Sequence, residues 1–184
     1  MTEPYVLYGS HASYYTAKTR SYLRKKAIPF IERMPSHPRF RSHVRPATAN
    51  HRVPQMETPD GLCLQDTTVI FDLLEARFPD IPAIPSTPRQ RVFTHLMELF
   101  ASEALVRMAW QYRWFHEANF QFVKMDFGRS FRPQGSDAEL LPRAKCGFGL
   151  IRVVGEIRAH PELRTQILPP PETPGTWSFC CWLR

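Results

Sequence analysis

The chain has 184 residues, of which 43% are hydrophobic and 22% are charged, as is ordinary for a globular protein with a buried core. The formal net charge is +7, but Lys and Arg are spread along the chain. The densest cluster, between Arg20 and Lys26, is typical of a solvated helix face. Nucleic acid is therefore the weakest of the partners considered.

The composition also bears on location and metal binding. The first residues lack a basic segment followed by an apolar run, so no secretory signal is expected. No stretch reaches the ~18 apolar residues of a membrane span. The four cysteines are Cys63, Cys146, Cys180 and Cys181. Their spacing fits neither a CxxC motif nor a metal site, so we expect reduced thiols, a cytoplasmic protein and no metal.

The first predicted elements form a β-α-β unit. An apolar run over residues 4–9 predicts a buried strand that ends at Gly9. Ser13 is placed as the N-cap of a helix that runs to Lys26, with cations near its C-terminal end. Residues 30–33 predict a second strand, parallel to the first.

A β-β-α unit follows an irregular, proline-containing segment, in which a short helix is expected at residues 39–44. The turn 58–61 joins two short strands at residues 55–57 and 62–64. Asp66-Thr67 can cap the next helix, which ends at Phe78-Pro79. Its predicted buried face consists of Val69, Ile70, Leu73, Leu74 and Phe78.

The second half of the chain is predicted to be helical up to residue 141. A long helix capped by Ser86 or Thr87 runs to about Trp114, and another covers residues 118–127. The predicted apolar face of the long helix consists of Val92, Leu96, Leu99, Phe100, Leu105, Met108, Ala109 and Tyr112. A third helix starts at residue 136 and is cut short by Pro142. Residues 142–184 are proline-rich with an apolar end, and two interpretations stay open for them: a disordered tail or a shifted reading frame.

Three local motifs resemble the cytosolic glutathione S-transferases. They are residues 8–13 leading into a helix, Arg52-Val53-Pro54, and Gln65-Asp66-Thr67 before an apolar helix. The resemblance implies an α/β thioredoxin-like N-terminal domain at residues 1–80, followed by a partial all-α C-terminal domain at residues 86–141. Asp66-Thr67 replaces the usual Glu-Ser pair, and the helical domain is shorter than is usual in the family.

The resemblance also implies a catalytic residue. Ser13 would donate a hydrogen bond to the thiolate of glutathione, which a helix N-terminus also favours. Tyr8 is the rival, since other classes use a tyrosine at the end of the first strand, although its ring also suits the core. A plain N-cap role for Ser13 remains open on the sequence alone.

Further residues would bind the tripeptide. In the family the peptide bond before the proline equivalent to Pro54 is cis, and the backbone of Val53 would pair with the cysteinyl part. Asp66 and Thr67 would hold the γ-glutamyl carboxylate, although the same residues make an ordinary cap. Arg52, with Arg39 as the second candidate, would meet the glycyl carboxylate. An apolar electrophile site would use Met108, Trp110, Tyr112, Trp114 and Phe115, a set that is also typical of core.

Two functional hypotheses follow from the resemblance. In the first, the chain is a glutathione S-transferase that uses glutathione as co-substrate, conjugates it to a small apolar electrophile in detoxification, and forms a homodimer. In the second, it is a non-catalytic glutathione-transferase-like interaction module or an inactive truncated relative.

Overall fold

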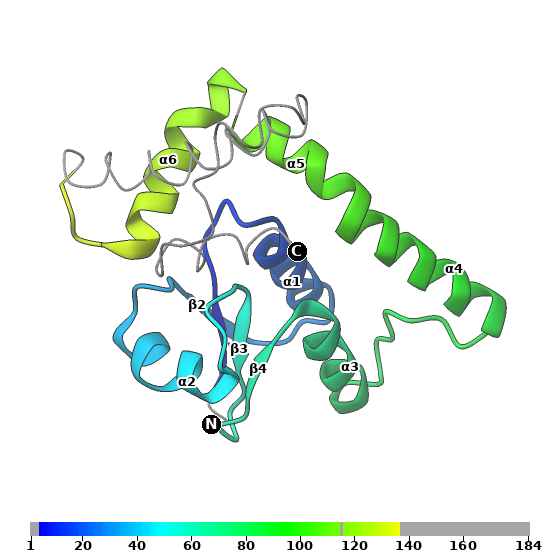
Figure 1. Cartoon of the computed structure of the whole chain (residues 1–184). Coiled ribbons are helices and arrows are strands. Elements are labelled where there is room, and N and C mark those ends of the chain that lie inside the picture. Colours follow the sequence, from blue (N-terminus) through cyan, green and yellow to red (C-terminus); the bar gives the residue numbers. More distant parts are fainter. Residues whose placement is uncertain (1–3, 115, 137–184) are drawn as a thin grey trace, which may run out of the picture.

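The computed structural model describes residues 4–114 and 116–136, and Figure 1 shows their arrangement. The N-terminal part is a four-stranded sheet in the order β2-β1-β3-β4, flanked by helices. β1 pairs parallel with β2 and antiparallel with β3, which pairs antiparallel with β4. The elements are β1 (Tyr5–Tyr8), α1 (Tyr14–Lys25), β2 (Phe30–Arg33), the π-helical turn η1 (Phe40–Val44), α2 (Arg45–Thr48), β3 (Gln55–Glu57), β4 (Cys63–Gln65) and α3 (Thr67–Arg77).

The two faces of the sheet carry separate cores, because side chains alternate along each strand. Leu7 of β1 and Met56 of β3 are fully buried against Leu23 of α1 and Leu74 of α3. Tyr8 lies on the opposite face, in a smaller cluster that includes residues of η1. This is the thioredoxin-like arrangement predicted from the sequence, and the predicted strand pair, turn and parallel β-α-β unit are all present.

A close backbone approach fixes the junction between β1 and α1. A Cβ atom added to Gly9 would lie 2.3 Å from both Cγ2 and Oγ1 of Thr16, closer than any real contact allows. Glycine is therefore required here, and α1 can lie directly against the end of β1. The segment that leads to Ser13 begins at Gly9, where this contact is made.

The helical part begins with α4 (Pro88–Leu99), the π-helical turn η2 (Phe100–Ala104) and α5 (Leu105–Trp114), followed by α6 (Glu117–Phe131). α4, η2 and α5 follow one another without a break, and α4 extends away from the sheet in Figure 1. The hydroxyls of Tyr14 and Tyr15 on α1 donate to the carbonyls of Ala101 and Ser102, at 2.9 and 2.7 Å. These bonds dock η2 against α1.

Two predictions about burial are wrong. α4 has no buried residue, and most of the apolar face predicted for the long helix is exposed, as is Val69 on α3. Helical periodicity identifies an apolar face, but a face becomes buried only where another element covers it. Ile70 and Leu74 do pack into the core as predicted.

The predicted helix at 118–127 corresponds to the longer α6, and Thr87 is the N-cap of α4 with Pro88 at its first turn. The residues expected to start a third helix lie almost entirely outside the described part of the chain, as does the whole of 142–184. The domain boundaries predicted from the sequence stay predictions. Among the described residues, no helix is both long and apolar enough to span a membrane.

Candidate functional site

Three segments converge at one edge of the sheet. The register pairs Tyr8 with Gln55 and Gln55 with Gln65. The end of β1, the start of β3 and the end of β4 therefore lie side by side. Their continuations are the segment to Ser13, the Val53-Pro54 step and Asp66-Thr67. The sheet thus brings together the three motifs that lie far apart in the sequence.

Ser13 caps α1 as predicted. Its Oγ accepts a hydrogen bond from the amide of Thr16 at 3.3 Å, and its backbone is extended, with φ −73° and ψ 124°. Capping uses a lone pair of the hydroxyl oxygen and leaves the hydroxyl hydrogen free to donate. Ser13 is half-buried and lines a cavity described below.

The Val53-Pro54 peptide bond is cis. Pro54 is buried, whereas Val53 is half-buried. Among the described residues, the amide and carbonyl of Val53 make no hydrogen bond. These two groups are therefore available to pair with an extended peptide.

Asp66 has an unusual backbone, with φ 83° and ψ 135°. A positive φ is unfavourable for a residue other than glycine, and such backbone strain is typical of functional sites. Its carboxylate accepts a hydrogen bond from the amide of Thr68 at 2.9 Å and caps α3. Thr67 is buried next to it, at the N-terminal end of an 11-residue helix.

Lys18 reaches this helix end from α1 and was not predicted from the sequence. Its Nζ donates to Thr67 Oγ1 at 3.0 Å and to Ser102 Oγ at 3.3 Å, and it forms an ion pair with Glu98 of α4. One cation therefore connects α1, α3 and the helical part beside Asp66. Lys18 is one of several cations in the sequence of α1, so no local signal distinguishes it.

Tyr8 occupies a different environment from Ser13. Its ring is fully buried, and its hydroxyl donates to Glu57 Oε2 at 3.2 Å. Burial and the neighbouring Glu57 carboxylate raise the pKa of Tyr8. Glu57 in turn accepts bonds from the guanidinium of Arg39, which lowers the pKa of Glu57. Arg39 is thus engaged with a carboxylate of the protein itself.

The same cluster contains a set of potential metal ligands. His43, Glu57 and Cys63 each offer one ligand atom, and these atoms lie within 4.8 Å of one another. However, the guanidinium of Arg39 already occupies the carboxylate of Glu57. A bound metal ion would have to displace or lie beside this cation, so the donor set does not fit a metal well.

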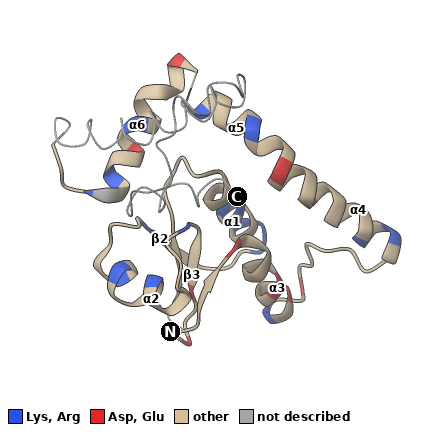
Figure 2. Ribbon diagram, in the orientation of Figure 1, with Lys and Arg blue, Asp and Glu red and all other residues tan. Residues whose placement is uncertain are grey.

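Arg52 is half-buried beside the cis bond, and its amide donates to Asn50 Oδ1 at 2.9 Å. The adjoining surface is cationic, and Figure 2 shows Lys or Arg on α2. An open depression of about 260 Å³ lies there. Its lining consists of Arg41, Arg45, Pro46, Ala49, Asn50 and His51.

A second cavity, of about 280 Å³, lies between the segment of Ser13 and the helices α5 and α6. Its lining consists of His11, Ala12, Ser13, Tyr14, Ala17, Ala109, Tyr112, Arg113, Asn119, Phe122 and Val123. Of the aromatic set proposed for an electrophile site, only Tyr112 lines this cavity. Trp114 is buried and packs edge-on against Phe127, Met108 is exposed, and Phe115 lies outside the described residues.

Comparison with known proteins agrees with this geometry. Residues 7–82 match the family model of the glutathione S-transferase N-terminal domain. Residues 7–82 are therefore similar to that domain. The resemblance inferred from the sequence is thereby confirmed, and the matched residues include Ser13, Pro54 and Asp66. No curated protein matches the chain.

Solved structures agree on the fold. Glutathione transferase Omega 3C from Trametes versicolor has a TM-score of 0.51 and 20% identity, over 87% of this chain and 74% of that one. A glutathione S-transferase from Rhodospirillum rubrum F11 has a TM-score of 0.50 and 15% identity, over 85% and 67% of the two chains. The alignments extend beyond the transferase domain, so the helices after it also follow the transferase fold.

Proposed function

We propose that the chain binds glutathione and conjugates its thiolate to an electrophile. The observation that carries this proposal is the convergence of Ser13, Val53-Pro54 and Asp66-Thr67 at one edge of the sheet, within a glutathione S-transferase N-terminal domain. Two fold neighbours were solved with glutathione or glutathione sulfonate bound. Glutathione is therefore the ligand that we assign to the three segments.

The γ-glutamyl end is assigned to Asp66 and Thr67. The first amides of α3 point towards this end of the helix and favour a carboxylate. Thr67 Oγ1 accepts from Lys18 and keeps its own hydrogen for donation. The Asp66 carboxylate offers an acceptor for the α-ammonium group of the ligand. Asp66→Asn should therefore weaken glutathione binding while keeping the cap on Thr68.

The cysteinyl and glycyl parts of glutathione are assigned to groups near the cis peptide bond. The amide and carbonyl of Val53, which make no hydrogen bond to any described residue, would bind the cysteinyl backbone as an added strand. Arg52 would meet the glycyl carboxylate, at the border of the cationic depression. Arg39 is a weaker candidate for this role, because its guanidinium is bound to Glu57.

Ser13 is assigned the catalytic role. Its hydroxyl would donate to the sulfur, and the N-terminus of α1 adds a favourable field, so the thiol loses its proton to solvent more readily. The sulfur then forms a bond with the electrophilic carbon, and the leaving group departs with its electron pair. Tyr8 is less suited to this role, because its hydroxyl is buried and donates to Glu57.

The exposed face of α4 supports the proposal of a homodimer. Val92, Phe93, Leu96, Met97, Leu99 and Phe100 have exposed fractions between 46% and 64%. A contiguous apolar surface of this kind is unusual on a monomer and marks an interaction site. The same face favours the alternative function, a non-catalytic interaction module, if its partner is another protein.

Two measurements test the proposed function. The full chain should be retained on immobilised glutathione, eluted by free glutathione, and should conjugate a chloronitrobenzene with release of chloride. Ser13→Ala should keep the retention and lose most of the turnover. Retention without turnover in the wild type would favour the interaction module, and absence of both would refute glutathione as the ligand.

A further inference from the structure

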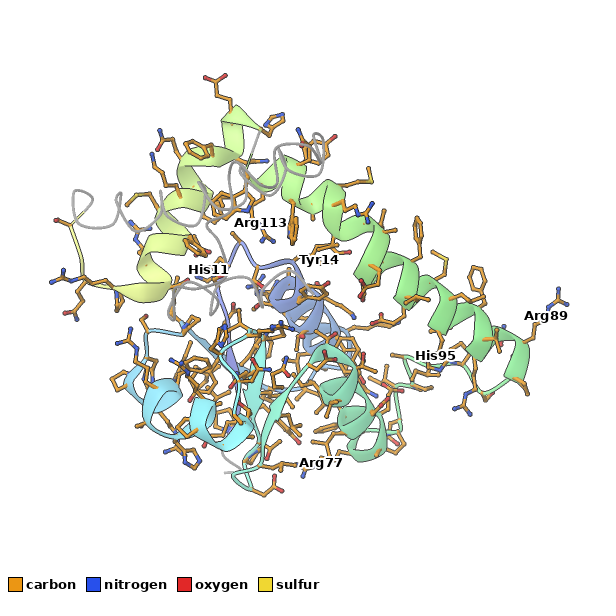
Figure 3. The ribbon with its side chains drawn as sticks, in the orientation of Figure 1. His11, Tyr14, Arg77, Arg89, His95 and Arg113 are labelled. Carbon is orange, nitrogen blue, oxygen red and sulfur yellow. The ribbon has the colours of Figure 1, made fainter. Side chains whose placement is uncertain are left out.

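The cavity beside Ser13 combines apolar walls with one cation. Ala109, Tyr112, Phe122 and Val123 supply apolar surface, and Arg113 of α5 is half-buried in the lining. Figure 3 shows Arg113 reaching from α5 towards the segment that carries His11 and Tyr14. Across residues 4–114 and 116–136, the guanidinium of Arg113 has no hydrogen bond or ion pair.

Two acidic groups that contact residues of the cavity lining already have partners. Asp126 is buried and accepts the amide of Ala12 at 2.9 Å, and it acts on Arg113 only through space. Glu32, which lies near His11, is bound by the guanidinium of Arg20. Neither carboxylate lines the cavity. Among the described residues the lining holds no Asp or Glu, so a negatively charged group inside the cavity would meet Arg113 without a lining carboxylate as its competitor.

Because Arg113 is partly buried, leaving its charge without a counterion costs free energy of desolvation. Desolvation lowers the pKa of Arg113, and the field of Asp126 partly opposes this effect. A guanidinium stays charged under either influence. An anion that binds in the cavity would supply the hydrogen-bond acceptors that the described residues do not, and a charge-assisted bond to arginine is stronger than a neutral one.

We propose that the electrophile accepted by this site is an apolar compound that carries a carboxylate, with Arg113 as the residue that selects the charge. This inference rests on the proposed function and makes it more specific. The apolar body of the compound would lie against Tyr112, Phe122 and Val123. Its carboxylate would pair with Arg113, and its reacting carbon would face the sulfur at Ser13.

A matched pair of compounds, a chloronitrobenzoate and the corresponding chloronitrobenzamide, separates charge from shape. Calorimetric titration of the full chain without glutathione should give a dissociation constant about tenfold lower for the acid, equivalent to about 1.4 kcal/mol. Arg113→Gln should abolish this preference, and Arg113→Lys should keep part of it. Arg107→Gln, on the exposed side of the same helix, removes the same charge and should leave the preference unchanged.

The outcomes distinguish the inference from the function on which it rests. Equal binding of acid and amide, binding of neither, or a preference that survives in Arg113→Gln would overturn the role of Arg113. Conjugation rates with glutathione, each divided by the uncatalysed rate, form a second measurement. A preference in binding without turnover of either compound would refute conjugation and still support the anion site. Turnover of both compounds without a preference for the acid would support conjugation and refute the anion site.

Discussion

The buried carboxylate of Asp126 on α6 accepts a hydrogen bond from the backbone amide of Ala12 at 2.9 Å. Ala12 directly precedes Ser13, so α6 fixes the segment on which the proposed catalytic residue lies. The contact joins positions 114 residues apart. Through it, the helical part of the chain positions the proposed thiol site of the N-terminal part.

We expect Asp126→Ala to loosen this segment. It leaves the Ala12 amide without its acceptor, and such a loss costs about 1–3 kcal/mol. Turnover should fall more than glutathione affinity does, because Ser13 moves while Asp66 and Val53 do not. Steady-state kinetics and urea unfolding would measure both effects. Asp126→Asn keeps an oxygen acceptor and serves as the matched control; equal losses in the two variants would contradict a positioning role.

Gly9→Ala should destabilise the junction of β1 and α1. The new methyl group would lie 2.3 Å from Thr16 Cγ2 and Oγ1, and overpacking of this kind costs about 1–3 kcal/mol. Thr16→Ala alone should cost less than an average core truncation, since Thr16 Oγ1 is buried without a hydrogen-bond partner among the described residues. Urea unfolding of the double variant should show partial rescue. Strict additivity would show that the two positions do not interact.

The stability of the N-terminal part should depend on pH through Glu57. The bonds from Arg39, and then the one from Tyr8, lower the pKa of Glu57 below its ordinary value of 4.5. The folded state therefore binds fewer protons than the unfolded state near and below that pH. The stabilisation is complete above pH 4.5 and is lost as the pH falls through the folded-state pKa. Thermal unfolding should show Glu57→Gln less stable at neutral pH, with the difference shrinking in acid.

The apolar face of α4 predicts a change in oligomeric state. Leu96→Asp places a charge in the middle of the exposed patch and should raise the dimer dissociation constant at least about tenfold, because buried unpaired charge is costly at an interface. Sedimentation analysis would measure this constant. Arg89→Glu alters the charge at the start of the same helix, outside the patch, and should have little effect. A wild type that is monomeric at every concentration would refute the homodimer.

Much of the N-terminal part could be predicted from local sequence. The Ser13 cap, the 58–61 turn and the Asp66 cap depend on residues within a few positions of one another. The Val53-Pro54 cis bond is present, as in the family that the sequence resembles. Local sequence alone could not show that these motifs act together, because only the register of the sheet brings them together. That expectation came from the resemblance to the family.

The residues that the sequence did not reveal act over long separations. Lys18 meets Glu98 across 80 positions, and Asp126 meets Ala12 across 114. Arg113 lies in a helix whose periodicity predicted only an apolar face. The same limit explains the errors at Val69 and α4, where an apolar stripe gave no information about which surface, if any, covers it.

The most direct test concerns the sulfur of bound glutathione. Titrating the ultraviolet absorbance of the thiolate against pH in the binary complex gives the pKa of the bound thiol. A hydroxyl donor and a helix N-terminus should lower this pKa by at least about one unit relative to free glutathione. Ser13→Ala should return the pKa of the bound thiol most of the way to that of free glutathione, with glutathione still bound. Ser13→Asp keeps the cap but cannot donate when ionised, and should return this pKa fully. An unshifted thiol in the wild type, or an unchanged shift in both variants, would contradict the assignment of Ser13.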